Sequence, residues 1–71
     1  MKRQLVRSTS LKSVGYDADT QTLEIEYRHG RVRRYVGVSA VVHAALLSVP
    51  GKAQFVEQVL EGGPYQREQL R

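Results

Sequence analysis

The amino-acid sequence predicts an α+β fold in which a small antiparallel sheet of about three strands is followed by two helices packed on one face. Two observations support this prediction. Apolar and polar residues alternate over residues 23–38 around a turn at His29 and Gly30, which is typical of a β-hairpin with one buried face. Farther along, the apolar residues change to a helical spacing that Pro50 interrupts. Residues 1–71 are expected to form a single domain.

The N-terminal part of the chain contains the first candidate strands. Residues 4–7 are predicted to be a short strand, and the apolar side chains of residues 11–16 point back toward a core. The hydroxyl groups of Ser8, Thr9 and Ser10 between them are expected to satisfy nearby backbone groups. Residues 17–21 are predicted to form a turn, because aspartate side chains accept hydrogen bonds from the backbone that follows them.

The hairpin that follows allows two registers. A two-residue turn at His29 and Gly30 pairs Tyr27 with Val32, whereas a bulged turn shifts the pairing by one residue and turns Arg31 and Arg33 toward the buried face. Burying two arginines costs more than exposing one valine, so we expect the two-residue turn. Arg34 then lies on the apolar face and has to reach solvent at an edge. In this register the buried face carries Leu23, Ile25, Tyr27, Val32 and Val36, and the open face carries Glu24, Glu26, Arg28, Arg31, Arg33 and Tyr35.

Two helices are predicted after the hairpin. Ser39 is a candidate N-cap for a helix over Ala40–Ser48, and a second helix is expected over residues 52–60, before Gly62, Gly63 and Pro64 end it. The polar residues 65–71 are expected to be a loose tail. The apolar stripe of the first helix comprises Val38, Val41, Val42, Ala45, Leu46 and Val49, and that of the second comprises Phe55, Val56, Val59 and Leu60.

Composition limits the classes of function. The formal net charge is +4, which suits either a polyanionic partner or simple solubility. The chain has no cysteine, which excludes a disulfide framework and is consistent with a reducing cytoplasm. It has no apolar run long enough for a transmembrane span and no signal-peptide pattern. We therefore expect a cytoplasmic protein without a membrane partner.

Residues that could support catalysis or metal binding are few. His29 and His43 lack the partners that a metal site needs, and both are expected to be solvated. Glu24 and Glu26 are expected to pair across strands with Arg28 and Arg33 rather than to act as an acid and a base. Ser8, Thr9, Ser10 and Ser13 have no histidine close in the sequence, and we expect them to cap turns and strand ends rather than to act as nucleophiles. We therefore expect no enzymatic activity, no cofactor and no metal site.

The basic residues of the hairpin form the candidate binding site. Arginine binds phosphate with two hydrogen bonds, and an aromatic side chain on the same sheet face can stack on an unpaired base. The alternative is a solvated sheet face on which the two glutamates dilute the positive charge. The candidate nucleic-acid-binding residues are Arg28, Arg31, Arg33, Arg34 and Tyr35, with Lys12 as an extension of the patch.

These residues belong to a longer pattern. Residues 6–17, VRSTSLKSVGYD, resemble the V-x-S-S-x-I-x-S-I-G-Y-D pattern of the KTSC domain family, and the resemblance continues through residues 23–27, Gly30 and residues 32–38. The family is named for its occurrence at the C-terminus of some lysyl-tRNA synthetases, and it also occurs as a free-standing bacterial protein. The central Y-x-Y of the family appears here as Arg33-Arg34-Tyr35, the later Y-F-N as Gln54-Phe55-Val56, and the closing Y-P-Y as Gly63-Pro64-Tyr65.

The resemblance implies a binding role of unassigned specificity, because RNA binding has been suggested for the family from its link to a tRNA synthetase. Together with the basic hairpin, it leads us to expect a small non-enzymatic module that binds RNA or another single-stranded nucleic acid. The alternative is a protein–protein interaction module, or a homodimer, that pairs through an exposed sheet edge.

Overall fold

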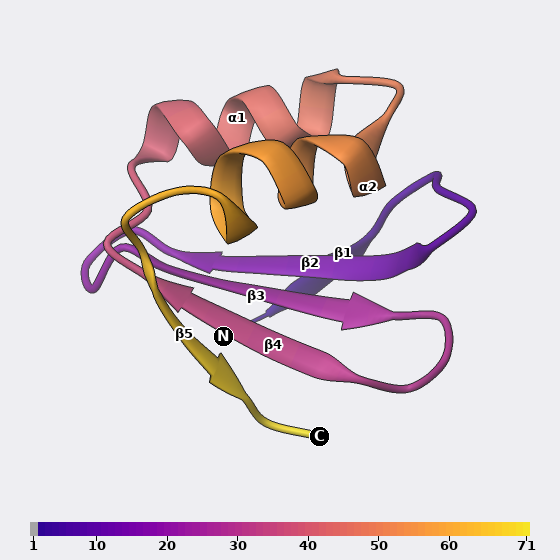
Figure 1. Ribbon diagram of the computed structural model, residues 1–71, viewed down its shortest axis with the longest axis horizontal. Coiled ribbons are helices and arrows are strands. Elements are labelled where there is room, and N and C mark those ends of the chain that lie inside the picture. The colour runs from indigo at the N-terminus through magenta and orange to yellow at the C-terminus, as the bar shows by residue number, and fades with distance from the viewer. Residues whose placement is uncertain (1) are drawn as a thin grey trace.

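The computed structural model describes residues 2–71, and their architecture confirms the predicted α+β class. Within this range the sheet has five antiparallel strands rather than about three, in the order β1-β2-β3-β4-β5. Helix α1 and helix α2, which continues directly into the π-helical segment η1, lie together on one face of the sheet (Figure 1). The elements are β1 (Arg3–Leu5), β2 (Leu11–Asp17), β3 (Thr22–Tyr27), β4 (Val32–Val36), α1 (Ala40–Ser48), α2 (Lys52–Phe55), η1 (Val56–Glu61) and β5 (Gln66–Gln69).

The outer strand β5 corrects the expectation of a loose C-terminal tail. Gln66–Gln69 runs antiparallel to β4, with Tyr35 opposite Arg67 and Arg33 opposite Gln69. Every residue of β5 is exposed, so backbone hydrogen bonds to β4 and polar side-chain contacts, such as Arg34 with Glu68, hold it there rather than apolar side chains. A strand without an alternating apolar face carries no period-two signal, and for this reason its polar sequence resembles a tail.

The hairpin between β3 and β4 uses the bulged turn. The Tyr27 N–H donates to the Arg31 carbonyl at 2.8 Å, and the Gly30 N–H donates to the Tyr27 carbonyl at 3.0 Å. Gly30 has φ +99°, a left-handed conformation that glycine adopts without steric cost. This is a three-residue turn that ends in a glycine bulge. The expected two-residue turn is therefore wrong, and Ile25 pairs with Arg33 instead of Arg34.

The shift of one residue exchanges the faces of β4. Tyr35 now lies on the helix-covered face with Leu23 and Ile25, and all three side chains have 0% exposure. Val32 lies on the opposite face but is still only 2% exposed, and its backbone forms hydrogen bonds with Leu70 and Arg71. The expected open-face position of Tyr35 is therefore wrong. The argument against the bulged turn failed because it treated the whole helix-covered face as buried, whereas Arg31 is exposed and Arg33 half-buried.

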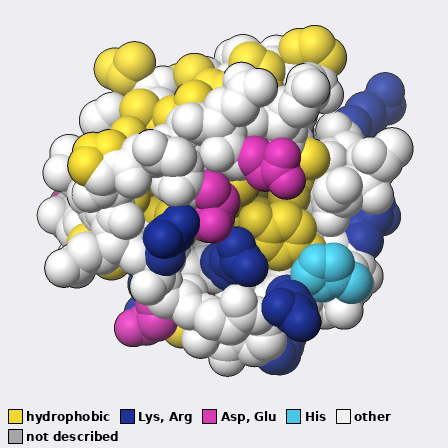
Figure 2. Space-filling model, in the orientation of Figure 1, with side chains coloured by type: hydrophobic (Ala, Val, Ile, Leu, Met, Phe, Trp, Pro, Cys, Tyr) yellow, Lys and Arg dark blue, Asp and Glu magenta, His cyan; other side chains and the backbone are white. Residues whose placement is uncertain are grey.

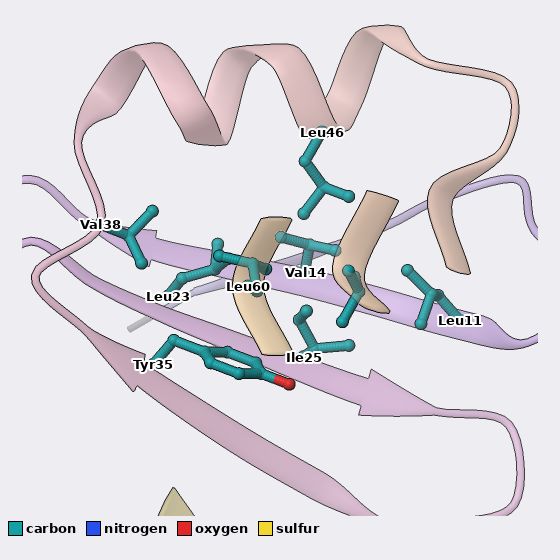
Figure 3. Close-up of a cluster of buried hydrophobic side chains, with 9 residues drawn as sticks. Leu11, Val14, Leu23, Ile25, Tyr35, Val38, Leu46 and Leu60 are labelled. Carbon is teal, nitrogen blue, oxygen red and sulfur yellow. The ribbon is translucent and has the colours of Figure 1, made fainter. Parts of the chain in front are cut away.

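The core lies between the sheet and the helices. The Tyr35 ring lies beneath the helical layer, beside Ile25 and Leu60 (Figure 3). Leu46 from α1 and Val56 from η1 contribute the opposite side of the same cluster. The remaining members are Leu11, Val14, Leu23 and Val38.

The helices follow the sequence pattern closely. The Ser39 hydroxyl accepts a hydrogen bond from the Val42 N–H at 3.3 Å, which confirms the predicted N-cap of α1. Val41 is 78% exposed, so its expected place in the buried stripe is wrong. The stop after η1 requires Gly63, because a Cβ there would lie 2.4 Å from the Val59 carbonyl oxygen. No helix of residues 2–71 is long and apolar enough to cross a membrane.

Candidate nucleic-acid interface

Two loops meet at one end of the sheet. The loop between β1 and β2 and the turn between β3 and β4 lie at the same end, on the right of Figure 1. The Arg28 N–H donates to the Ser10 carbonyl at 2.9 Å, and Arg28 Nε donates to the Ser8 carbonyl at 2.9 Å. The Ser8 hydroxyl accepts hydrogen bonds from the Ser10 and Leu11 N–H groups, which confirms the predicted role for Ser8. The two loops therefore form one hydrogen-bonded surface.

This surface carries four exposed cationic side chains, Arg7, Lys12, Arg28 and Arg31, which we call the loop-end cluster. Among the interactions of residues 2–71, none of the four forms an ion pair. Their charges are therefore available to a partner. Unpaired guanidinium and ammonium groups on neighbouring loops attract anions, above all phosphates.

A groove of about 590 Å³ opens beside the loop-end cluster. One wall is formed by the hairpin residues Tyr27, His29 and Arg31, and the other by the helical residues Glu57 and Glu61. The Tyr27 and His29 rings stack with centroids 5.2 Å apart and an angle of 11° between their planes. Figure 2 shows this region as an apolar hollow bordered by basic, acidic and histidine side chains. The groove therefore combines an aromatic surface with charges of both signs.

Arg33 and Tyr35 meet at Glu61 inside the groove wall. The Tyr35 hydroxyl donates to Glu61 Oε2 at 2.5 Å, Arg33 lies 3.2 Å from the same oxygen, and Arg67 lies 3.1 Å from Oε1. The hydrogen bond from Tyr35 and the two cations lower the pKa of Glu61, despite partial burial. Burial, with the hydrogen bond to Glu61, raises the pKa of Tyr35 well above its usual value. These contacts join η1 to β4 and β5, so both predicted site residues serve the fold.

Arg34 belongs to a balanced network on the open face of the sheet. It lies 3.0 Å from Glu24 Oε2 and 3.4 Å from Glu68, while Arg3 lies 2.7 Å from Glu24 Oε1. Burial opposes ionisation of Glu24, but its hydrogen bonds and proximity to Arg3 and Arg34 outweigh that effect and lower its pKa. Arg34 is therefore neutralised by its neighbours and does not offer a free positive charge.

The partners expected for the two strand glutamates differ from those observed. Glu26 accepts a hydrogen bond from Ser13 at 2.8 Å and lies near Arg3 and Arg71. The hydrogen bond from Ser13 and the nearby cations, including Lys12, lower the pKa of Glu26. Charge pairing of the glutamates is confirmed, but the expected pairing with Arg28 and Arg33 is wrong because the register differs.

His43 also departs from the expectation of a solvated side chain. Its ring stacks on Tyr16 with centroids 4.4 Å apart, and the Tyr16 hydroxyl donates to the Val38 carbonyl at 2.6 Å. Burial lowers the pKa of His43. The stack anchors α1 to β2 and lies outside the groove.

The structure therefore divides the predicted site. It brings Arg28, Arg31 and Lys12 to one exposed end of the sheet, but it places Arg34 on the opposite face and Tyr35 in the core. The sequence argument missed Arg7, Tyr27 and His29. The stack of Tyr27 on His29 and the groove beside it depend on contacts with the helical layer, which the alternating pattern of the hairpin does not show.

Together, the fold and this surface define a small α+β domain with a helix-covered antiparallel sheet and a cationic loop end. The chain belongs to the KTSC domain family, whose model matches residues 7–65, and this confirms the resemblance in the sequence. An uncharacterized protein of Stutzerimonas stutzeri is 38% identical over 65 residues, which cover 92% of each chain. The crystal structure of a KTSC domain protein from Yersinia pestis is 32% identical with a TM-score of 0.88, over 99% of this chain and 97% of that one.

Proposed function

We propose that this domain is a cytoplasmic, non-enzymatic module that binds single-stranded nucleic acid, foremost RNA, through its loop-end cluster. The observation that carries the proposal is the set of four exposed cations, of which Arg7, Arg28 and Arg31 lie on two hydrogen-bonded loops and Lys12 lies at the start of β2. None of the four forms an ion pair within residues 2–71. Phosphates of a flexible strand can approach such a set from solvent. The stacked Tyr27 and His29 rings beside the cluster provide a surface for an unpaired base.

The shape of the interface favours a single strand over a duplex. The groove of about 590 Å³ is of the size of a small-molecule pocket, and a base can enter it only when it is unpaired and splayed from its strand. The open face of the sheet contributes little, because Arg3, Arg34 and Arg71 are neutralised there by Glu24, Glu26 and Glu68. The loop end is therefore the proposed contact surface.

A salt titration tests this proposal. We expect labelled single-stranded RNA to bind with a log–log salt slope of about −2 to −3, because three or four phosphate contacts each contribute about −0.7 on single strands. Fluorescence anisotropy at about 50 mM and about 200 mM salt measures the slope. A parallel titration with single-stranded DNA of the same sequence shows whether the 2′-hydroxyl contributes. Absence of RNA binding at the lower salt concentration would contradict the proposal.

The protein-interaction alternative rests on the exposed edge strand β1. Leu5 in this strand is 77% exposed, and an unpaired edge can accept a strand from a second copy. The strand has only three residues, which offer few backbone hydrogen bonds. On this alternative, sedimentation at high concentration is expected to detect a dimer that Leu5→Lys abolishes. A strictly monomeric species removes the homodimer version.

A further inference from the structure

The two carboxylates in the groove wall, Glu57 and Glu61, differ in whether they are free to accept a hydrogen bond from a ligand. Glu61 already accepts from Tyr35 and lies within ion-pair distance of Arg33 and Arg67. Glu57, one turn earlier on η1, is exposed and forms no ion pair among residues 2–71. An unpaired carboxylate in a groove intended only for phosphates would repel its ligand. The presence of the Glu57 carboxylate in the groove therefore suggests that it accepts a hydrogen bond from a donor group of the ligand.

The opposite wall suggests what that donating group is. The nearly parallel Tyr27 and His29 rings provide a flat aromatic surface, and the exposed side of His29 allows a further ring to extend the stack. Arg31 lines the same groove and can neutralise a phosphate at its mouth. A planar ligand with N–H donors on one edge and a phosphate on the other side complements this arrangement. A nucleotide with an unpaired base has this chemistry.

We propose that the groove holds one unpaired base and selects guanine, with the Glu57 carboxylate accepting from its N1–H and N2–H₂ groups. The guanine ring extends the Tyr27–His29 stack on the free face of His29, and its phosphate faces Arg31. This inference rests on the proposed function. Guanine fits best because its two neighbouring donors match the two oxygens of a carboxylate. Uracil has a single N–H between two carbonyl oxygens, which the carboxylate repels.

The test compares RNA oligomers that differ at one base. The probes are an all-uridine RNA and the same RNA with a central guanosine or a central inosine, which lacks the N2 amino group. The guanosine RNA is expected to bind about tenfold more tightly than the all-uridine RNA, since a bidentate pair of hydrogen bonds discriminates between bases. Inosine is expected to bind with intermediate affinity. Equal affinity for all three RNAs, with a steep salt dependence, overturns the guanine pocket and leaves the proposed function standing.

The Glu57→Ala variant shows whether Glu57 recognises guanine or only repels the RNA, because the two roles change the affinity for the guanosine RNA in opposite directions. Recognition predicts weaker binding of the guanosine RNA, with unchanged or tighter binding of the all-uridine RNA because a negative charge is lost. Simple repulsion predicts tighter binding of both RNAs by the same factor, which would overturn the inference. The matched control Glu68→Ala removes the same charge from the open sheet face, and it is expected to leave the guanosine preference intact. If no RNA binds at low salt, the inference and the proposed function fail together.

Discussion

Replacing Tyr35 with alanine is expected to lower the free energy of unfolding by about 3–5 kcal/mol, the usual cost of removing a large buried aromatic side chain. The side chain has 0% exposure and fills the space between β4 and η1. Its hydroxyl also fixes Glu61, which in turn holds Arg33 and Arg67. A domain of 71 residues has a total stability of about 4–11 kcal/mol, at about 0.05–0.15 kcal/mol per residue. The variant is therefore expected to unfold at a much lower urea concentration, and to be partly unfolded at 25 °C if the stability of the parent lies at the lower end of this range.

Urea denaturation followed by circular dichroism measures this loss, with Tyr35→Phe as the matched control. Phenylalanine keeps the ring and removes only the hydrogen bond to Glu61, which retains both of its cations, so we expect a loss of about 1–2 kcal/mol. The register predicted from the sequence gives the opposite result. If Tyr35→Ala left stability unchanged and weakened RNA binding, the ring would be exposed, and the placement of Tyr35 in the core would be wrong.

The double variant Arg28→Glu/Arg31→Glu is expected to weaken binding of single-stranded RNA by about 100-fold at about 50 mM salt. Each reversal replaces about 1 kcal/mol of attraction to a phosphate with a similar repulsion in water, and salt screening reduces the sum. Both side chains are exposed at the loop end. Arg28→Glu removes the hydrogen bond from Arg28 Nε to the Ser8 carbonyl, but the backbone hydrogen bond from residue 28 to the Ser10 carbonyl remains, so the fold is expected to stay intact. Anisotropy titration measures the affinity, and circular dichroism checks the fold.

Two milder double variants test whether RNA binding depends on the cations of the loop end or only on the net charge of the domain. Arg28→Gln/Arg31→Gln and Ala40→Glu/Val41→Glu each lower the formal net charge of +4 by two. The second pair lies at the start of α1, at the opposite end of the sheet from the loops (Figure 1), where acidic residues suit the helix dipole. We expect a loss of about tenfold for the arginine pair and less than about twofold for the α1 pair. Equal losses would mean that binding follows net charge, and the loop end would not be the site.

Local features of the sequence determined most of the points at which the helices begin and end. Ser39 caps α1 at the predicted residue, and α1 covers the predicted Ala40–Ser48. Pro50 separates the helices, and Gly63 permits the close approach of the backbone that ends η1. These features depend on neighbours within a few residues, so the sequence contains the information that decides them.

The candidate site was predictable only in part, for the same physical reason. Arg28 and Arg31 lie in the turn and are exposed, as expected, although the two-residue turn from which the exposure of Arg31 was argued is wrong. The positions of Arg33, Arg34 and Tyr35 depend completely on the register, since a shift of one residue exchanges the two faces of a strand. Gly30 decides that shift by accepting a left-handed backbone at the third residue of the turn.

By itself, the sequence determined the α+β class, the bounds of α1, the start of the second helix, the β3–β4 hairpin and the family, but not the π-helical form of Val56–Glu61. The tertiary structure alone decided the register, the addition of β5, and the pairing of Arg34 with Glu24 and Glu68. Strand pairing joins residues far apart in the chain through backbone groups that every residue carries, so side-chain pattern cannot specify it uniquely. The groove between Tyr27, His29 and Glu57 exists for this reason, because a hairpin and a helix distant in sequence form its two walls.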